Sequence, residues 1–153
     1  MKPRTAGVHE AIGRLQRLTQ LFHQRRAQLA QGAGLTEARW EVLERIASEH
    51  FMPSLFARRR ASSAPAVSRI IRQLLTKKLI TVSISDTDGR QRRYQLTPRG
   101  QKTLDALRAT RSRAIDAIWM HLDPRALAAF SQFSGELISR LEAYSRDGAK
   151  EDT

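Results

Sequence analysis

Apolar residues recur every three or four positions through most of the chain, which is the spacing of amphipathic helices. Breaks in this spacing fall at glycines, at Ser or Thr residues able to cap a helix, and at prolines able to begin one. The pattern predicts six helices, at about residues 8–31, 37–47, 55–60, 64–78, 98–122 and 124–146. Their expected N-terminal caps include Thr36, Ser54, Ser63 and Thr97.

Between the fourth and fifth helices the pattern changes to a two-residue alternation. Apolar residues from Ile80 to Ile84 alternate with Thr and Ser, as in a half-buried strand. Asp88 and Gly89 supply the positive φ angles of a tight hairpin turn. A return strand then runs to Leu96 and carries Arg90 near its start. We therefore expect a β-hairpin with an apolar base and a basic tip.

These elements define a fold class: mainly α with a small β-hairpin wing, that is, a winged helix-turn-helix. The 153 residues, 41% of them hydrophobic, are enough for one domain with one core. Within it we expect a DNA-binding lobe at about residues 35–100. The long apolar stripes of residues 5–31 and 101–146 exceed what this lobe can cover, so we expect them to form a homodimer lobe.

Positive charge is concentrated in the same segment. Residues 55–100 contain 11 of the 27 Lys and Arg residues and two acids, out of a net charge of +12. A charge run alone commonly marks a solvated face, but here it coincides with a helix-turn-helix. Such an excess attracts a polyanion and releases its counterions, which makes double-stranded DNA the expected partner.

The fourth helix separates packing residues from candidate DNA contacts. Val67, Ile70, Ile71 and Leu74 share one side, and small, polar and guanidinium groups occupy the opposite side. Candidate contacts there and in the wing are Ser62, Ser63, Pro65, Ala66, Ser68, Arg69, Arg72, Arg90, Arg92 and Arg93. Among them Ser63 is chiefly a cap, Ser62 and Ser68 suit phosphates, and Pro65 and Ala66 suit a thymine methyl group. Arg69 and Arg72 suit bases or phosphates, and Arg90 suits a narrow minor groove.

Three stretches resemble the MarR family of winged helix-turn-helix transcription regulators. LTEARWEVLERIA is similar to its second helix, SSAPAVSRIIRQLLTKKLI to its recognition helix, and DTDGRQRRYQLTPRG to its wing and the start of the fifth helix. The resemblance runs from Leu35 to about Leu107. It implies that Asp88 and Arg90 are the wing pair, with Arg90 entering the minor groove. Arg60 departs from an apolar family position, and Gly89 from a frequent Arg.

The resemblance also implies a dimer and a ligand. Family members commonly bind small anionic aromatic molecules between the dimer lobe and the DNA lobe. Arg14, Arg17, His23 and Trp40 lie on elements able to line such a cleft. Without cysteine the chain has no thiol switch, so a ligand is the expected cause of any regulated DNA release.

Other classes of function find less support. There is no cysteine, phosphate-binding loop, GxSxG or HExxH motif, and the four histidines are scattered. No apolar run approaches the roughly 18 residues of a membrane span, and no signal-peptide pattern is present. We therefore expect a cytoplasmic, ligand-responsive repressor that binds a pseudo-palindromic operator as a homodimer, without catalysis, cofactor or metal. An architectural DNA-binding protein, and an enzyme or metal protein using the histidines, are the alternatives.

Overall fold

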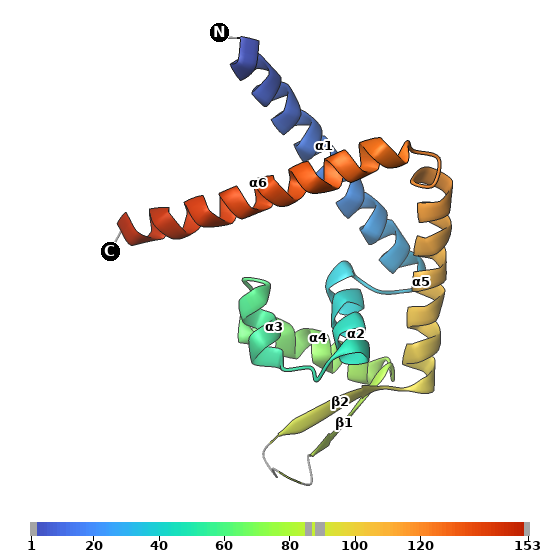
Figure 1. Ribbon diagram of the computed structural model, residues 1–153. Coiled ribbons are helices and arrows are strands. Elements are labelled where there is room, and N and C mark those ends of the chain that lie inside the picture. Colours follow the sequence, from blue (N-terminus) through green and yellow to red (C-terminus); the bar gives the residue numbers. More distant parts are fainter. Residues whose placement is uncertain (1–2, 85–86, 88–90, 152–153) are drawn as a thin grey trace. The chain divides into compact units, whose positions relative to one another are not determined.

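The computed structural model describes the backbone of residues 3–84, 87 and 91–151, and the side chains from residue 5 to residue 147 within these ranges. The chain divides into two compact units, Met1–Arg111 and Ser112–Thr153. The helices are α1 (Pro3–Gly32), α2 (Glu37–Ser48), α3 (Pro53–Arg59), α4 (Ala64–Thr76), α5 (Pro98–Ile118) and α6 (Pro124–Glu151) (Figure 1). The strands are β1 (Ile80–Ile84) and β2 (Arg92–Leu96). The predicted fold class, six helices with one hairpin, is confirmed for the described residues.

The core of the first unit lies among α2, α4 and α5. Trp40, Leu43, Leu74 and Leu104 are fully enclosed there. Removing such side chains from water contributes about 1.5–3 kcal/mol each, so these four hold the helices together against the cost of ordering them. The predicted packing side of α4 is confirmed, because its buried residues are Val67, Ile71 and Leu74 and Ile70 packs against the core.

The helix starts follow their capping residues, with one exception. Thr36 accepts a hydrogen bond from the backbone N–H of Arg39 at 3.3 Å, as expected of a cap. The prediction that Ser54 caps the third helix is wrong: α3 begins at Pro53 after Met52, and no side chain caps it. Proline has no N–H to satisfy and a φ angle already suited to the first turn, so the helix starts one residue before the serine.

A compact joint connects α4, β1 and α5. Lys78 adopts a left-handed conformation with φ 57° just after α4. The backbone N–H of Thr97 then donates to the carbonyl of Leu79 at 3.0 Å, and its hydroxyl donates to the carbonyl of Lys78 at 2.7 Å. The same hydroxyl accepts from the N–H of Gly100 at 2.9 Å, as a cap of α5. The joint fixes the base of the hairpin to the start of α5.

The hairpin extends from this joint, away from α2 and α3 (Figure 1). Its strands are antiparallel and pair Ile80 with Leu96 and Val82 with Tyr94. The expected half-buried strand is only partly correct, because exposure rises from 2% at Ile80 to 43% at Val82 and 67% at Ile84. The alternation persists, but the core ends at the base of the hairpin and leaves the outer apolar side chains uncovered. The predicted Asp88–Gly89 turn lies outside the described residues.

The second unit, consisting of the end of α5 and all of α6, exposes most of its large apolar side chains. They include Ile115, Ile118, Leu122, Phe130, Phe133, Ile138, Leu141 and Tyr144, each more than 40% exposed. The N-terminal half of α1 behaves alike, with Val8 and Ile12 at 52% and 44%. Monomeric proteins rarely leave contiguous apolar stripes of this length in water.

Candidate nucleic-acid interface

The outward face of α4 is polar and accessible. Pro65, Ser68, Arg69 and Arg72 are all exposed, on the side opposite the buried residues. Arg69 and Arg72 are three positions apart and therefore project from neighbouring turns of the same face. This geometry suits a helix that enters the major groove, whose width of about 12 Å admits one helix.

The turn before α4 uses its polar groups for structure. The Ser63 hydroxyl accepts from the backbone N–H of Ala66 at 3.3 Å, and the half-buried Ser62 donates its N–H to the carbonyl of Ala57 at 2.9 Å. Ala61 has a φ of 49°, which reverses the chain between α3 and α4. Ser63 is therefore a cap, as expected.

A contact that the sequence pattern did not predict holds α4 against α2. The Arg39 Nε donates to Gln73 Oε1 at 2.9 Å in a half-buried position, across 34 residues of sequence. Neither residue belongs to an apolar stripe or a motif, so nothing local indicated the pair. It positions the face that carries Arg69 and Arg72.

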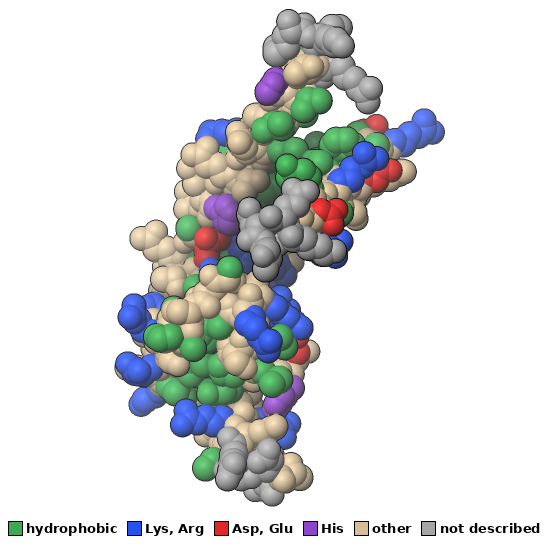
Figure 2. Space-filling view, turned by 90° about the vertical axis from the view of Figure 1, so that its left-hand side faces the viewer, with side chains coloured by type: hydrophobic (Ala, Val, Ile, Leu, Met, Phe, Trp, Pro, Cys, Tyr) green, Lys and Arg blue, Asp and Glu red, His purple; other side chains and the backbone are tan. Residues whose placement is uncertain are grey.

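The basic residues of the first unit fall into two groups. Arg59 and Arg60 on and after α3 pair with Glu49 and Glu41, respectively. In contrast, no ion pair within the described part of the chain involves the following exposed residues of α3, α4 and β2: Arg58, Arg69, Arg72, Arg92 and Arg93. Figure 2 shows basic side chains spread over the surface. The positive charge of α4 and the wing is thus available to phosphates.

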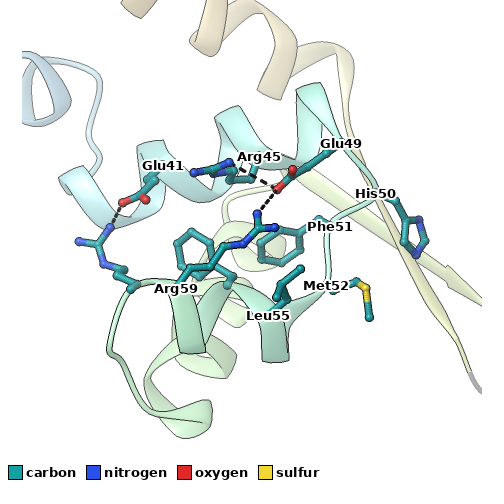
Figure 3. Close-up of a pocket in the computed structure, with 10 residues that line it drawn as sticks. Glu41, Arg45, Glu49, His50, Phe51, Met52, Leu55 and Arg59 are labelled. Atoms are coloured by element: carbon teal, nitrogen blue, oxygen red, sulfur yellow. Dashed lines mark ion pairs between the residues drawn. The ribbon is translucent and has the colours of Figure 1, made fainter. Parts of the chain in front are cut away.

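Arg60 illustrates how this division arises. It stands where the MarR resemblance led us to expect an apolar residue, and it forms an ion pair with Glu41 on α2 (Figure 3). The pair joins the end of α3 to α2 by charge instead of apolar packing. Its guanidinium is therefore engaged within the protein.

The wing contributes two described arginines. Arg92 is opposite Ile84 and Arg93 is opposite Ser83 in the hairpin register, so the two point to opposite faces of the sheet. Asp88 and Arg90, which the sequence singled out at the tip, lie outside the described residues. The described part of β2 therefore places one guanidinium on each face of the wing.

The four candidate effector residues do not come together in one group. Arg14 pairs with Glu10 at 2.7 Å, Arg17 donates to Gln20 at 2.9 Å, and both contacts stay within α1. The exposed His23 lies 3.9 Å from Glu37. Nine residues of helix, about 13 Å at 1.5 Å per residue, separate Arg14 from His23.

Trp40, the aromatic member of that set, is fully buried. The guanidinium of Arg26 lies 4.5 Å from the centre of its ring, in a cation–π contact, and its Nε1 donates to Glu44 at 3.2 Å. In this chain Trp40 is thus a core residue whose polar atom is already satisfied.

Glu44 connects α2 to α5. Arg108 donates to both of its carboxylate oxygens, the shortest distance being 2.6 Å from Nη2 to Oε2. Burial opposes ionisation of Glu44, but the hydrogen bonds from Arg108 and Trp40 and the nearby charges of Arg108 and Arg111 outweigh it. The pKa of Glu44 is consequently lower than usual. The hydrogen bond to Glu44 likewise raises the pKa of Arg108.

Beside this network is an open hollow of about 320 Å³. It is lined by Arg26, Glu41, Glu44, Arg45, Ser48 and Arg111. Its two carboxylates are engaged by arginines that do not line the hollow, Glu41 by Arg60 and Glu44 by Arg108. Three guanidinium groups therefore face a space whose acids are already paired, which favours an anion.

Two further observations bear on other classes of function. No group of three or more His, Cys, Asp or Glu side chains in the described ranges is arranged to hold a metal ion. Among the same residues, no helix combines the length and the apolar character needed to cross a membrane.

Comparisons with known proteins identify the fold. No protein-family model matches the sequence, and no curated protein matches it. A solved MarR family transcription regulator superposes with a TM-score of 0.83 at 18% identity, over 94% of this chain and 95% of its own. Staphylococcus aureus MarR in complex with salicylate and kanamycin gives 0.75 at 18% identity, over 88% and 91%. The S. aureus MepR–DNA complex gives 0.68 at 18% identity, over 83% and 93%.

The chain therefore has the winged helix-turn-helix fold of the MarR family transcription regulators. The family resemblance stated from the sequence is confirmed in structure over most of the chain. At 18% identity the likeness establishes the fold, and the function is argued separately below.

Proposed function

We propose that this protein is a sequence-specific, double-stranded DNA-binding transcription regulator. The observation that carries the proposal is the outward face of α4, where Arg69 and Arg72 are exposed and have no acidic partner among the described residues. Arg92 and Arg93 extend the positive charge onto the wing. A solved structure with the same fold, S. aureus MepR, is bound to DNA.

The assignment of roles follows from position. Arg69 and Arg72 are to contact bases or phosphates in the major groove, with Pro65, Ala66 and Ser68 beside them. Arg92 and Arg93 are to contact the flanking backbone, and Asp88 and Arg90 keep their predicted role at the tip of the wing. No step of this activity requires catalysis or a cofactor.

We further propose that the active form is a homodimer. The exposed apolar residues of α6 and of the N-terminal half of α1 need a partner, and a second copy supplies an identical apolar surface. Two heads related by a two-fold axis would bind half-sites about 34 Å apart, on a pseudo-palindromic operator.

The regulatory part of the proposal is ligand-responsive repression. The hollow lined by Arg26, Arg45 and Arg111 is a better anion site than the originally expected set, because Arg14 and Arg17 are engaged within α1 and Trp40 is buried. A small aromatic acid there would contact α1, α2 and α5 at once. S. aureus MarR, of the same fold, has been solved with salicylate.

DNA binding is tested by selecting bound duplexes from a random pool and measuring affinity by fluorescence anisotropy. We expect a dyad-symmetric motif. Arg69→Ala or Arg72→Ala should cost about 1–3 kcal/mol if the residue contacts a base, and relax one base preference. Arg140→Ala, an exposed arginine of α6, is the matched control and should change little.

Two outcomes would refute this function. Equal affinity for all duplexes would favour the architectural alternative, in which DNA is coated without sequence preference. Full retention of affinity and base preference in the Arg69→Ala, Arg72→Ala double variant would remove α4 from the interface.

Assembly is tested by light scattering on the intact protein. Leu141→Asp places a charge on the exposed apolar stripe of α6, and we expect it to shift a dimer to monomer. Glu142→Gln, the neighbouring exposed position, is the control. A wild-type protein that is monomeric and binds a full operator would refute the homodimer.

A further inference from the structure

A second, smaller hollow lies between α2 and α3 and is separate from the sites described so far. Its volume is about 100 Å³, and Figure 3 shows the side chains that surround it. Phe51, Met52, Leu55 and Phe56 supply apolar surface, and Phe51 and Phe56 are themselves buried. The two phenyl rings pack with centroids 5.5 Å apart, so this surface is a fixed part of the fold.

Charged groups line the rest of the hollow. On one side Arg45 of α2 and Arg59 of α3 approach the same carboxylate oxygen, Glu49 Oε1, with their Nη1 atoms at 3.7 Å and 3.9 Å. Both distances exceed the 2.7–3.2 Å, roughly, of an N–H···O hydrogen bond. On the other side Glu41 is engaged by Arg60.

These contacts leave a net positive charge toward the hollow. Two guanidinium groups share one carboxylate, and each guanidinium has five N–H donors in a planar fork. Neither fork is satisfied by the single distant oxygen of Glu49. A cation would meet only acids that already have arginine partners, whereas an anion would meet two unsatisfied forks.

We propose that this hollow binds a small aromatic carboxylate, with the carboxylate bridging Arg45 and Arg59 and the ring lying on Leu55, Phe51 and Met52. Carboxylate oxygens match the guanidinium fork in a bidentate way. A cavity on the order of 150 Å³ accommodates benzene, so an open hollow of this size accepts one ring that partly protrudes. Inorganic phosphate would satisfy the arginines but leave the apolar surface bare.

The site is distinct from the hollow beside Glu44, which faces α1 and α5 through Arg26 and Arg111. It lies instead on α3, immediately before the turn that leads into α4. The proposal concerns ligand binding by the free protein and is independent of the DNA-binding function.

The test is a titration of the full-length protein with benzoate, followed by amide chemical shifts in two-dimensional NMR and by calorimetry. Benzoate should shift the amides of residues 51–55. Benzamide, which has the same ring without the charge, and benzylamine, which has the opposite charge, should bind at least about 10-fold more weakly.

Variants separate this site from any other. Arg45→Gln and Arg59→Gln should each weaken benzoate binding at this site about 10-fold, because each removes one fork. Arg58→Gln, the adjacent exposed arginine of α3 that does not line the hollow, should leave binding unchanged. Circular dichroism confirms that each variant is folded.

The proposal is overturned if benzamide shifts the same amides with the affinity of benzoate. It is also overturned if Arg45→Gln and Arg59→Gln, both folded, bind benzoate as the wild type does. Shifts confined to residues outside 41–60 would equally overturn it, since benzoate would then occupy a different site.

Discussion

Replacing Gly100 with alanine should disrupt the joint between the recognition helix, the wing and α5. A Cβ atom at this position would lie 1.9 Å from the carbonyl oxygen of Leu79 and 2.9 Å from its carbon. Real Cβ atoms essentially never come within 3.0 Å of another heavy atom, so the two backbones must separate by about 1.1 Å, the difference of 3.0 Å and 1.9 Å. Backbone atoms cannot move aside as a flexible side chain can.

The cost follows from the hydrogen bonds in the joint. A shift of this size would break the bond from Thr97 N–H to Leu79 and strain the two that involve the Thr97 hydroxyl. Three bonds at about 0.5–1.5 kcal/mol each, with an overpacking cost of about 1–3 kcal/mol, are opposed by about 1 kcal/mol of improved helix propensity. After relaxation we expect a net loss of about 2–4 kcal/mol, a large part of the 5–15 kcal/mol or so that is typical of a domain.

The assay is urea unfolding followed by circular dichroism at one fixed protein concentration, because dimerisation affects apparent stability. Gly32→Ala is the matched control, since no atom lies within 4 Å of its added Cβ. It should be neutral or stabilising by up to about 1 kcal/mol. If Gly100→Ala unfolds with a free energy indistinguishable from that of Gly32→Ala, the steric account of the joint is wrong.

Two further predictions concern the polar contacts of α2. Glu44→Gln should lower the free energy of unfolding by about 1–2 kcal/mol at neutral pH, discounted because the Arg108 partner is partly exposed. Since the pKa of Glu44 is lowered on folding, its contribution is complete above the usual glutamate pKa and is lost as the pH falls through the lowered value; unfolding curves of wild type and variant should therefore converge in acid, and a gap that persists there contradicts the assignment. Arg39→Ala and Gln73→Ala should show a coupling energy of about 0.5–1.5 kcal/mol in a double-mutant cycle, and additive effects would mean that the contact does not hold α4 to α2.

Local chemistry was sufficient to predict the architecture of the head. The caps at Thr36 and Ser63 and the Thr97–Pro98 start of α5 depend on residues a few positions apart, and all are present. The side of α4 that packs inward follows from the 3.6-residue helical period alone. Ser54 failed for an equally local reason, because proline was the stronger start signal.

Contacts between distant elements were beyond this kind of reasoning. Arg39 and Gln73 are 34 residues apart, and Glu44 and Arg108 are 64 apart, so no spacing rule relates them. The expected effector residue Trp40 was assigned from its element and its ring, but its burial depends on how α1, α2 and α5 pack. The exposure of the outer wing likewise depends on where the core ends, which a two-residue alternation does not encode.

The placement of acids explains how a head with so much positive charge can remain folded and still present that charge outward. Glu37, Glu41, Glu44 and Glu49, on or next to α2, accept arginines from α1, α3 and α5 and within α2. These pairs neutralise basic residues where elements meet, so they add cohesion to the apolar core. The described residues of α4 and β2 include no acid, and their arginines stay uncompensated at the surface. Packing thus uses the negative charge of one helix behind the recognition helix, and the unpaired positive charge that remains is concentrated where a nucleic acid would bind.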